Sequence, residues 1–127
     1  MSNFLIATRE NNISKDIRES AISAGFNVSE AKDGISAVQM CGETDFDIVI
    51  MDTALPELDG FSACKEIRNS KEMPIIFISS SRSESDKILG FEVGADDFMV
   101  KPISVKVLMA RVNAIIRRQT GKRPLSG

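Results

Sequence analysis

The chain of 127 residues contains no histidine, tryptophan or tyrosine, and it has only two cysteines. Without imidazole side chains, histidine acid–base catalysis, a Ser-His-Asp triad and a histidine metal site are excluded. Cys41 and Cys64 form no C-x-x-C pair, so neither a disulfide framework nor a thiolate zinc site is predicted. Buried, reduced thiols are typical of a cytoplasmic protein, and the cytoplasm is the location that we expect.

Long apolar runs are absent as well. No stretch of the sequence approaches the length that crosses a bilayer, and no secretory leader is recognised before the first apolar segment. We therefore expect no membrane contact. With 43% apolar and 27% charged residues, the composition is that of one globular domain.

Charge is distributed unevenly, although the net charge is only −2. Residues 1–100 carry nine basic and 18 acidic side chains, whereas residues 101–127 carry seven basic side chains and no acid. Such a basic end is suited to contact nucleic acid or a second domain. For this segment alone, a solvated helix face that continues into a linker is the favoured interpretation.

Short apolar runs alternate with helical patterns along the chain. Strands are predicted at residues 3–8, 26–31, 47–51, 74–78 and 97–100, and helices at 13–24, 35–41, 61–67, 88–93 and 103–118. This alternation predicts an α/β fold, with a doubly wound, flavodoxin-like parallel sheet of five strands and helices on both faces. Residues 120–127 lack an apolar period and are predicted to be a linker.

Polar side chains follow the predicted strands at the edge where ligands bind in such folds. Thr8 lies at the end of the first strand, while Asp52 follows the third strand, Ser79 the fourth and Lys101 the fifth. A carboxylate nucleophile, a hydroxyl donor and a cation together suit phosphoryl chemistry. Taken singly, each also has an ordinary structural role as a cap, a turn residue or a solvated charge.

The combination of these residues resembles the receiver domain of bacterial two-component response regulators over residues 3–119. The resemblance is carried by the segment 47–60 (DIVIMDTALPELDG), Ser79, Phe98 and Lys101-Pro102. It implies a CheY-like (βα)5 sandwich in which Asp52 is the phosphoacceptor and Lys101 contacts the phosphate. Ser79 and Phe98 fall at the switch positions, where plain turn chemistry and core packing are the alternatives.

Residues 94–100 (GADDFMV), Ala110-Arg111 and Arg117-Arg118 are most similar to the OmpR/PhoB-like class. That similarity implies a homodimer through the fourth helix, fifth strand and fifth helix, a partner histidine kinase and a DNA-binding effector domain beyond the 120–127 linker. The expected dimer face contains Lys87, Asp96, Asp97 and Arg111. Val107 replaces an acid of that class, so an ion pair with Lys87 is expected to be missing.

The sequence departs from the family at the end of the first strand. The family has two adjacent acids there that hold a divalent metal, whereas this chain has Thr8 and Arg9. The exchange changes the local formal charge from −2 to +1, so magnesium binding is expected to be weak or absent. We expect Arg9 to pair with Asp52, the alternative being that it bends into solvent. Glu10 is expected to point away and not to restore the metal site.

Three functions remain open at this point. The first is an atypical receiver that works as an interaction and dimerisation module with little dependence on phosphate. The second is a conventional receiver that is phosphorylated at Asp52 with magnesium. The third, an unrelated enzyme or nucleotide-binding protein, is disfavoured because Ala54 stands where a haloacid-type phosphatase has an acid and residues 8–12 contain no glycine.

Overall fold

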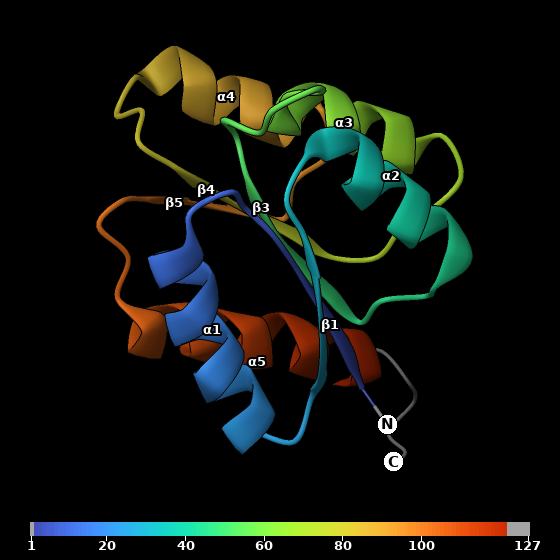
Figure 1. Ribbon diagram of the computed structural model, residues 1–127, viewed down its shortest axis with the longest axis vertical. Coiled ribbons are helices and arrows are strands. Elements are labelled where there is room, and N and C mark those ends of the chain that lie inside the picture. Colours follow the sequence, from blue (N-terminus) through green and yellow to red (C-terminus); the bar gives the residue numbers. More distant parts are fainter. Residues whose placement is uncertain (1, 122–127) are drawn as a thin grey trace.

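A computed structural model describes residues 2–121 of the chain. Five strands alternate with five helices along it (Figure 1). The strands are β1 (Asn3–Ala7), β2 (Asn27–Ala31), β3 (Ile48–Asp52), β4 (Ile75–Ser79) and β5 (Asp97–Val100). The helices are α1 (Asn11–Ser23), α2 (Gly34–Glu43), α3 (Gly60–Arg68), α4 (Glu84–Glu92) and α5 (Val105–Gly121).

All strand pairs are parallel, and the strands lie in the order β2-β1-β3-β4-β5. Helices α2, α3 and α4 cover one face of the sheet, and α1 and α5 cover the other (Figure 1). Because β3 and β4 are covered on both faces, every residue in them is buried, which accounts for their continuous apolar sequences. The predicted doubly wound α/β fold is confirmed.

Two separate apolar cores hold these layers together. One lies beneath α2 and α3 and includes Cys41 and Cys64, both reduced and buried. Burial raises the pKa of Cys41 to about 11 and also raises that of Cys64, which disfavours the reactive thiolate form of both. The other core lies beneath α1 and α5 and includes Ile17 and Leu108.

Side-chain caps fix where three of the helices begin. The side chains of Asp33, Asp59 and Ser83 accept hydrogen bonds from backbone N–H groups at the starts of α2, α3 and α4. The cap at Ser83 starts α4 four residues before the apolar residues that predicted a helix there. Glu10 occupies the cap position of α1 but makes no side-chain cap bond, which leaves its carboxylate available elsewhere.

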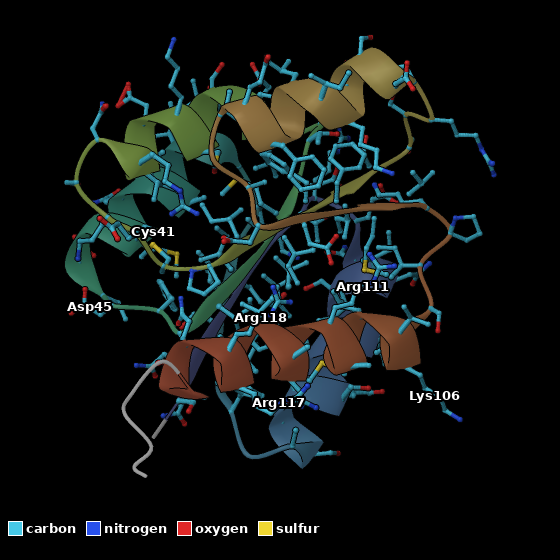
Figure 2. The ribbon with its side chains drawn as sticks, turned by 180° about the vertical axis from the view of Figure 1, so that it is seen from behind. Cys41, Asp45, Lys106, Arg111, Arg117 and Arg118 are labelled. Atoms are coloured by element: carbon cyan, nitrogen blue, oxygen red, sulfur yellow. The ribbon has the colours of Figure 1, made fainter. Side chains whose placement is uncertain are left out.

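The final helix continues further than predicted. It includes Thr120 and Gly121, the first two residues of the expected linker, and residues 122–127 of that linker lie outside the described residues. Lys106, Arg111, Arg117 and Arg118 are spread along it (Figure 2). Within residues 2–121, no helix has the length and apolarity needed to span a bilayer.

Candidate functional site

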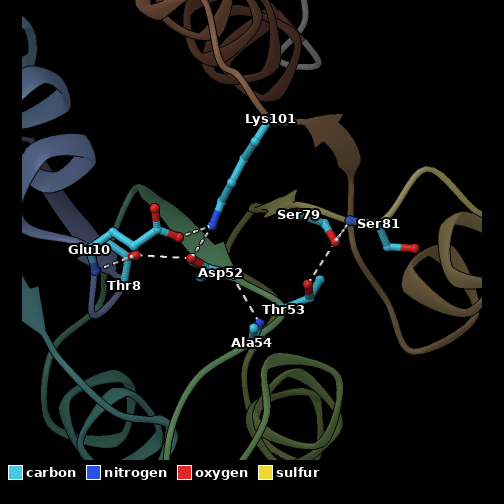
Figure 3. A network of polar contacts seen from close by, with 8 residues as sticks. All are labelled: Thr8, Glu10, Asp52, Thr53, Ala54, Ser79, Ser81 and Lys101. Atoms are coloured by element: carbon cyan, nitrogen blue, oxygen red, sulfur yellow. Dashed lines mark hydrogen bonds and ion pairs between the residues drawn. The ribbon is translucent and has the colours of Figure 1, made fainter.

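The residues predicted from the strand ends do meet at one edge of the sheet (Figure 3). Asp52 is the last residue of β3 and Ser79 the last of β4, while Thr8 and Lys101 directly follow β1 and β5. These four strands are neighbours in the sheet, and parallel strands end at the same edge. We call the group formed by Thr8, Glu10, Asp52 and Lys101 the Asp52 pocket.

Donors from this chain contact both carboxylate oxygens of Asp52, whose side chain is only 1% exposed. Oδ2 accepts a hydrogen bond of 3.0 Å from the Thr8 hydroxyl and one of 2.7 Å from Lys101 Nζ. Oδ1 accepts a 3.0 Å bond from the backbone N–H of Ala54. Buried carboxylates need such partners, because an unpaired buried charge is costly.

Lys101 lies between two carboxylates. Its ammonium contacts Asp52 Oδ2 and also Glu10 Oε2 (Figure 3). Burial by itself would lower the pKa of Lys101, but hydrogen bonds to Asp52 and then Glu10 outweigh that effect and raise it. Lys101 is therefore a fixed cation in this pocket, and its peptide bond to Pro102 is cis.

The expectation that Arg9 pairs with Asp52 is wrong. Arg9 is exposed and makes no ion pair with Asp52, whereas Thr8 is fully buried and points into the pocket. Successive side chains of an extended segment point to opposite sides, so only one of the two can face Asp52. The hydroxyl of Thr8 also accepts the backbone N–H of Glu10 at 3.1 Å, which fixes its proton toward Asp52.

The position expected for Glu10 is also wrong. Alternation along a strand predicted that Glu10 would point away, but β1 ends at Ala7 and the chain has already turned toward α1 at Glu10. Its carboxylate therefore lies in the pocket against Lys101. The pocket thus holds two carboxylates and one ammonium.

Both carboxylates of the Asp52 pocket are already paired with a donor of this chain. Magnesium requires an octahedral shell of oxygen ligands and is strongly repelled by fixed cations at short range. Here an ammonium lies between the two carboxylates, and a threonine hydroxyl donates to one of them. Within the part of the chain that the structure describes, no three acidic or thiol side chains are grouped to hold a metal ion.

Ser79 lies beside the pocket, and its hydroxyl oxygen accepts hydrogen bonds from Thr53 Oγ1 at 2.8 Å and from the Ser81 N–H at 3.1 Å. Sequence reasoning missed Thr53. The available signal was a hydroxyl-bearing residue directly after Asp52, at the end of a strand that neighbours the strand of Ser79.

Phe98 is buried, with 5% of its surface exposed, and its ring packs edge-on to that of Phe77 with centroids 6.2 Å apart. Gly90 of α4 permits this packing. A Cβ atom at position 90 would lie 2.8 Å from the Phe98 ring, so only glycine lets α4 approach so closely.

Of the residues expected at a dimer face, Lys87 lies on α4, Asp97 on β5 and Arg111 on α5, and Asp96 directly precedes β5. All of them except Lys87 have partners within the chain. Asp97 accepts from Arg111 at 3.1 Å, and Asp96 pairs with Arg68 at 3.2 Å. Lys87 is exposed and has no ion-pair partner among residues 2–121. Val107, which stands where the OmpR/PhoB-like class has an acid, lies on α5.

Comparisons with known proteins agree on one family. The family model "Response regulator receiver domain" matches residues 4–113. The chain is 42% identical to the uncharacterized transcriptional regulatory protein YclJ of Bacillus subtilis, covering 77% of this chain and 44% of that protein. It is 39% identical to the probable transcriptional regulator ycf27 of Cyanidium caldarium, covering 90% of this chain and 46% of that protein.

Among solved structures, the receiver domain of the Francisella response regulator 1452 superposes with a TM-score of 0.88 at 30% identity, covering 94% of this chain and 99% of that one. The chain spans less than half the length of both curated relatives.

Proposed function

Because the chain belongs to the response regulator receiver domain family, we propose that it is an atypical receiver, controlling dimerisation and an attached DNA-binding domain with weak or no magnesium-dependent phosphorylation at Asp52. Membership makes it a signalling domain of a two-component response regulator rather than a classical enzyme. Its curated relatives are named as transcriptional regulators. We assign it to the OmpR/PhoB-like class and to the cytoplasm, where a transcription factor meets DNA.

One observation carries this proposal, namely the set of groups around the Asp52 carboxylate. Where the family has two acids, this chain presents a buried hydroxyl that donates to Asp52 and an exposed guanidinium. The Oδ2 atom of Asp52 is thus bound by Thr8 and Lys101 together, without a carboxylate pair for magnesium. Phosphoryl transfer depends on a metal that neutralises the developing charge, so transfer to Asp52 is expected to be slow.

The proposed output is a change in assembly, with a second copy of the chain as the partner. Ile88 and Phe91 of α4 and Val107 of α5 are large apolar residues with 44–50% of their surface exposed. Helix α4 carries acids in its first turn, whereas Lys106 and Arg111 lie on α5. A two-fold axis that brings α4 of one copy to α5 of the other would match these opposite charges and cover the apolar residues.

One observation favours a second function, that of a conventional receiver with a partner histidine kinase. Glu10 places a carboxylate beside Lys101, on the same side as Asp52. If Lys101 moves, Glu10 and Asp52 are two of the oxygen ligands that magnesium requires. In that case an Asp52 oxygen attacks the phosphorus of the donor, and the bond from phosphorus to the donor breaks.

Intact mass after treatment with acetyl phosphate and magnesium separates the two functions. We expect no stoichiometric phosphate adduct on the wild type, and a clear adduct on the Thr8→Asp/Arg9→Asp variant, in which the acid pair is restored. Asp52→Ala in both backgrounds identifies the modified residue. A stoichiometric adduct on the wild type that is absent from Asp52→Ala would establish the conventional receiver instead.

A further inference from the structure

A series of hydroxyl groups leads away from the Asp52 pocket toward α4. Serine occurs at every second position from Ser79 to Ser85, and Thr53 follows Asp52. In the structure these hydroxyls are joined by hydrogen bonds, directly or through a backbone N–H. We call this series the hydroxyl chain; its members are Thr53, Ser79, Ser81, Ser83 and Ser85.

The inner end of the hydroxyl chain is buried, and the donor and acceptor of each of its hydrogen bonds are defined. Thr53 is 8% exposed and Ser79 1% exposed, and Thr53 Oγ1 donates to Ser79 Oγ at 2.8 Å. The Ser81 N–H donates to the same oxygen at 3.1 Å. A hydroxyl oxygen has two lone pairs, so Ser79 is saturated as an acceptor. Any displacement of its oxygen therefore acts on Thr53 and on the backbone at Ser81.

The outer end forms the N-terminal cap of α4. Ser81 and Ser83 are joined twice, because the Ser81 hydroxyl donates to Ser83 Oγ and the Ser83 N–H donates to Ser81 Oγ, each at 3.2 Å. Ser83 Oγ accepts the Asp86 N–H at 3.0 Å. With two donors on it, Ser83 can only donate to Ser85. Hydrogen bonds through Ser83 and Ser81 thus link the cap of α4 to the Ser79 hydroxyl.

We propose that Thr53 is a positioning residue that holds the Ser79 hydroxyl in place and thereby supports the N-terminal cap of α4, which is linked to Ser79 through Ser81 and Ser83. Thr53 is anchored on the strand that carries Asp52, since its N–H donates to Ile78 O at 3.0 Å and its carbonyl accepts from Gly60. The hydroxyl chain therefore joins the end of the strand that carries Asp52 to the start of α4, which bears the exposed Ile88 and Phe91. The signalling meaning of this coupling rests on the proposed function, but the coupling itself does not.

Fast amide exchange with water, measured by NMR on the unphosphorylated chain without metal, tests the coupling. Thr53→Val removes the hydroxyl at nearly constant volume, and we expect exchange of the Ser81 and Asp86 amides to rise about three- to tenfold, as befits loss of one hydrogen bond. Thr53→Ser retains the hydroxyl and should leave both rates at the wild-type value. The Ser36 amide, capped by Asp33 on α2, should not change in any variant.

Two further variants distinguish an effect of the hydroxyl chain on amide exchange from a general loss of stability. Thr44→Val makes the same substitution at a half-buried threonine whose hydroxyl has no partner in the described chain, and it should leave Asp86 unchanged. Ser81→Ala should speed exchange at Asp86 but not at Ser81 itself, whose N–H still donates to Ser79.

Faster exchange at Ser81 alone in Thr53→Val, or equal increases at Ser36 and Asp86, would overturn the proposal. If Thr53→Val does not fold, an unchanged Asp86 rate in Ser81→Ala would do so. Because no phosphodonor is present, none of these results depends on whether Asp52 is phosphorylated.

Discussion

At the scale of single residues, the chemistry of Asp52 is decided by which side chains face it. Thr8 faces Asp52 and Arg9 does not, although the two are adjacent. The fixed positive charge of the pocket therefore comes from Lys101, which is held by Asp52 and Glu10 together. The main loss relative to the family is thus the absence of acids at positions 8 and 9, with a donor hydroxyl added at Thr8.

Replacing Lys101 with methionine tests how strongly this ammonium stabilises the buried carboxylate. Lys101→Met keeps most of the length of the side chain but leaves Asp52 with only Thr8 and the Ala54 N–H as donors. We expect the free energy of unfolding at pH 7 to fall by about 1–3 kcal/mol, measured by urea denaturation. In an Asp52→Asn background the same substitution should cost less, and an equal cost in both would contradict the pairing.

At the scale of elements, the sequence predicted the strand ends of the candidate site but not the turn from β1 into α1. The strand ends, and with them Thr8, Asp52, Ser79 and Lys101, follow from apolar runs that leave a polar residue at each end. Glu10 was misplaced because strand alternation was extended past Ala7, where the backbone already turns toward α1. Arg9 was misplaced because its charge alone was considered, although it and Thr8 point to opposite sides. The Thr53–Ser79 contact joins residues 26 positions apart in sequence, and only the register of β3 with β4 brings them together.

Helix α1 is tied to strand β2 by Glu30, whose pKa is lowered chiefly by a hydrogen bond from the buried Ser14, with Arg18 and Lys32 also contributing. Because its pKa is lowered in the folded chain, the Glu30 carboxylate stabilises the fold at pH values above its ordinary pKa of 4.5. This contribution is lost as the pH falls below 4.5. We expect Ser14→Ala to bring the Glu30 pKa, measured by NMR titration, back toward 4.5 and to weaken the loss of stability in acid. Lys32→Ala should have a smaller effect; the reverse order would contradict the assignment.

At the scale of the whole molecule, acids in the first turn of α4 and basic side chains along α5 lie on the two helices that flank β5. The intramolecular pair of Asp97 with Arg111 holds part of this charge within one copy. Lys87 and Val107 belong to different helices of the proposed dimer face, and neither has a charged partner in residues 2–121. A dimer formed here would thus lack one rim ion pair.

Supplying the missing acid should strengthen that dimer. Val107→Glu is expected to tighten self-association up to about fivefold at low salt, because rim ion pairs contribute about 0–1 kcal/mol each. Sedimentation equilibrium measures this, with Val107→Gln as the neutral control, and added salt should remove the difference. The gain should vanish in a Lys87→Ala background. If the gain in affinity persisted in the Lys87→Ala background, the proposed α4–β5–α5 dimer would be wrong.

The most direct test of the account is a calorimetric titration of magnesium into the wild type and into Thr8→Asp/Arg9→Asp. The double variant restores the acid pair, whereas Arg9→Ala removes only an exposed cation. We expect no measurable magnesium binding to the wild type or to Arg9→Ala, and saturable binding to the double variant that is lost with Asp52→Ala. Magnesium binding to the wild type as tight as to the double variant would contradict the account.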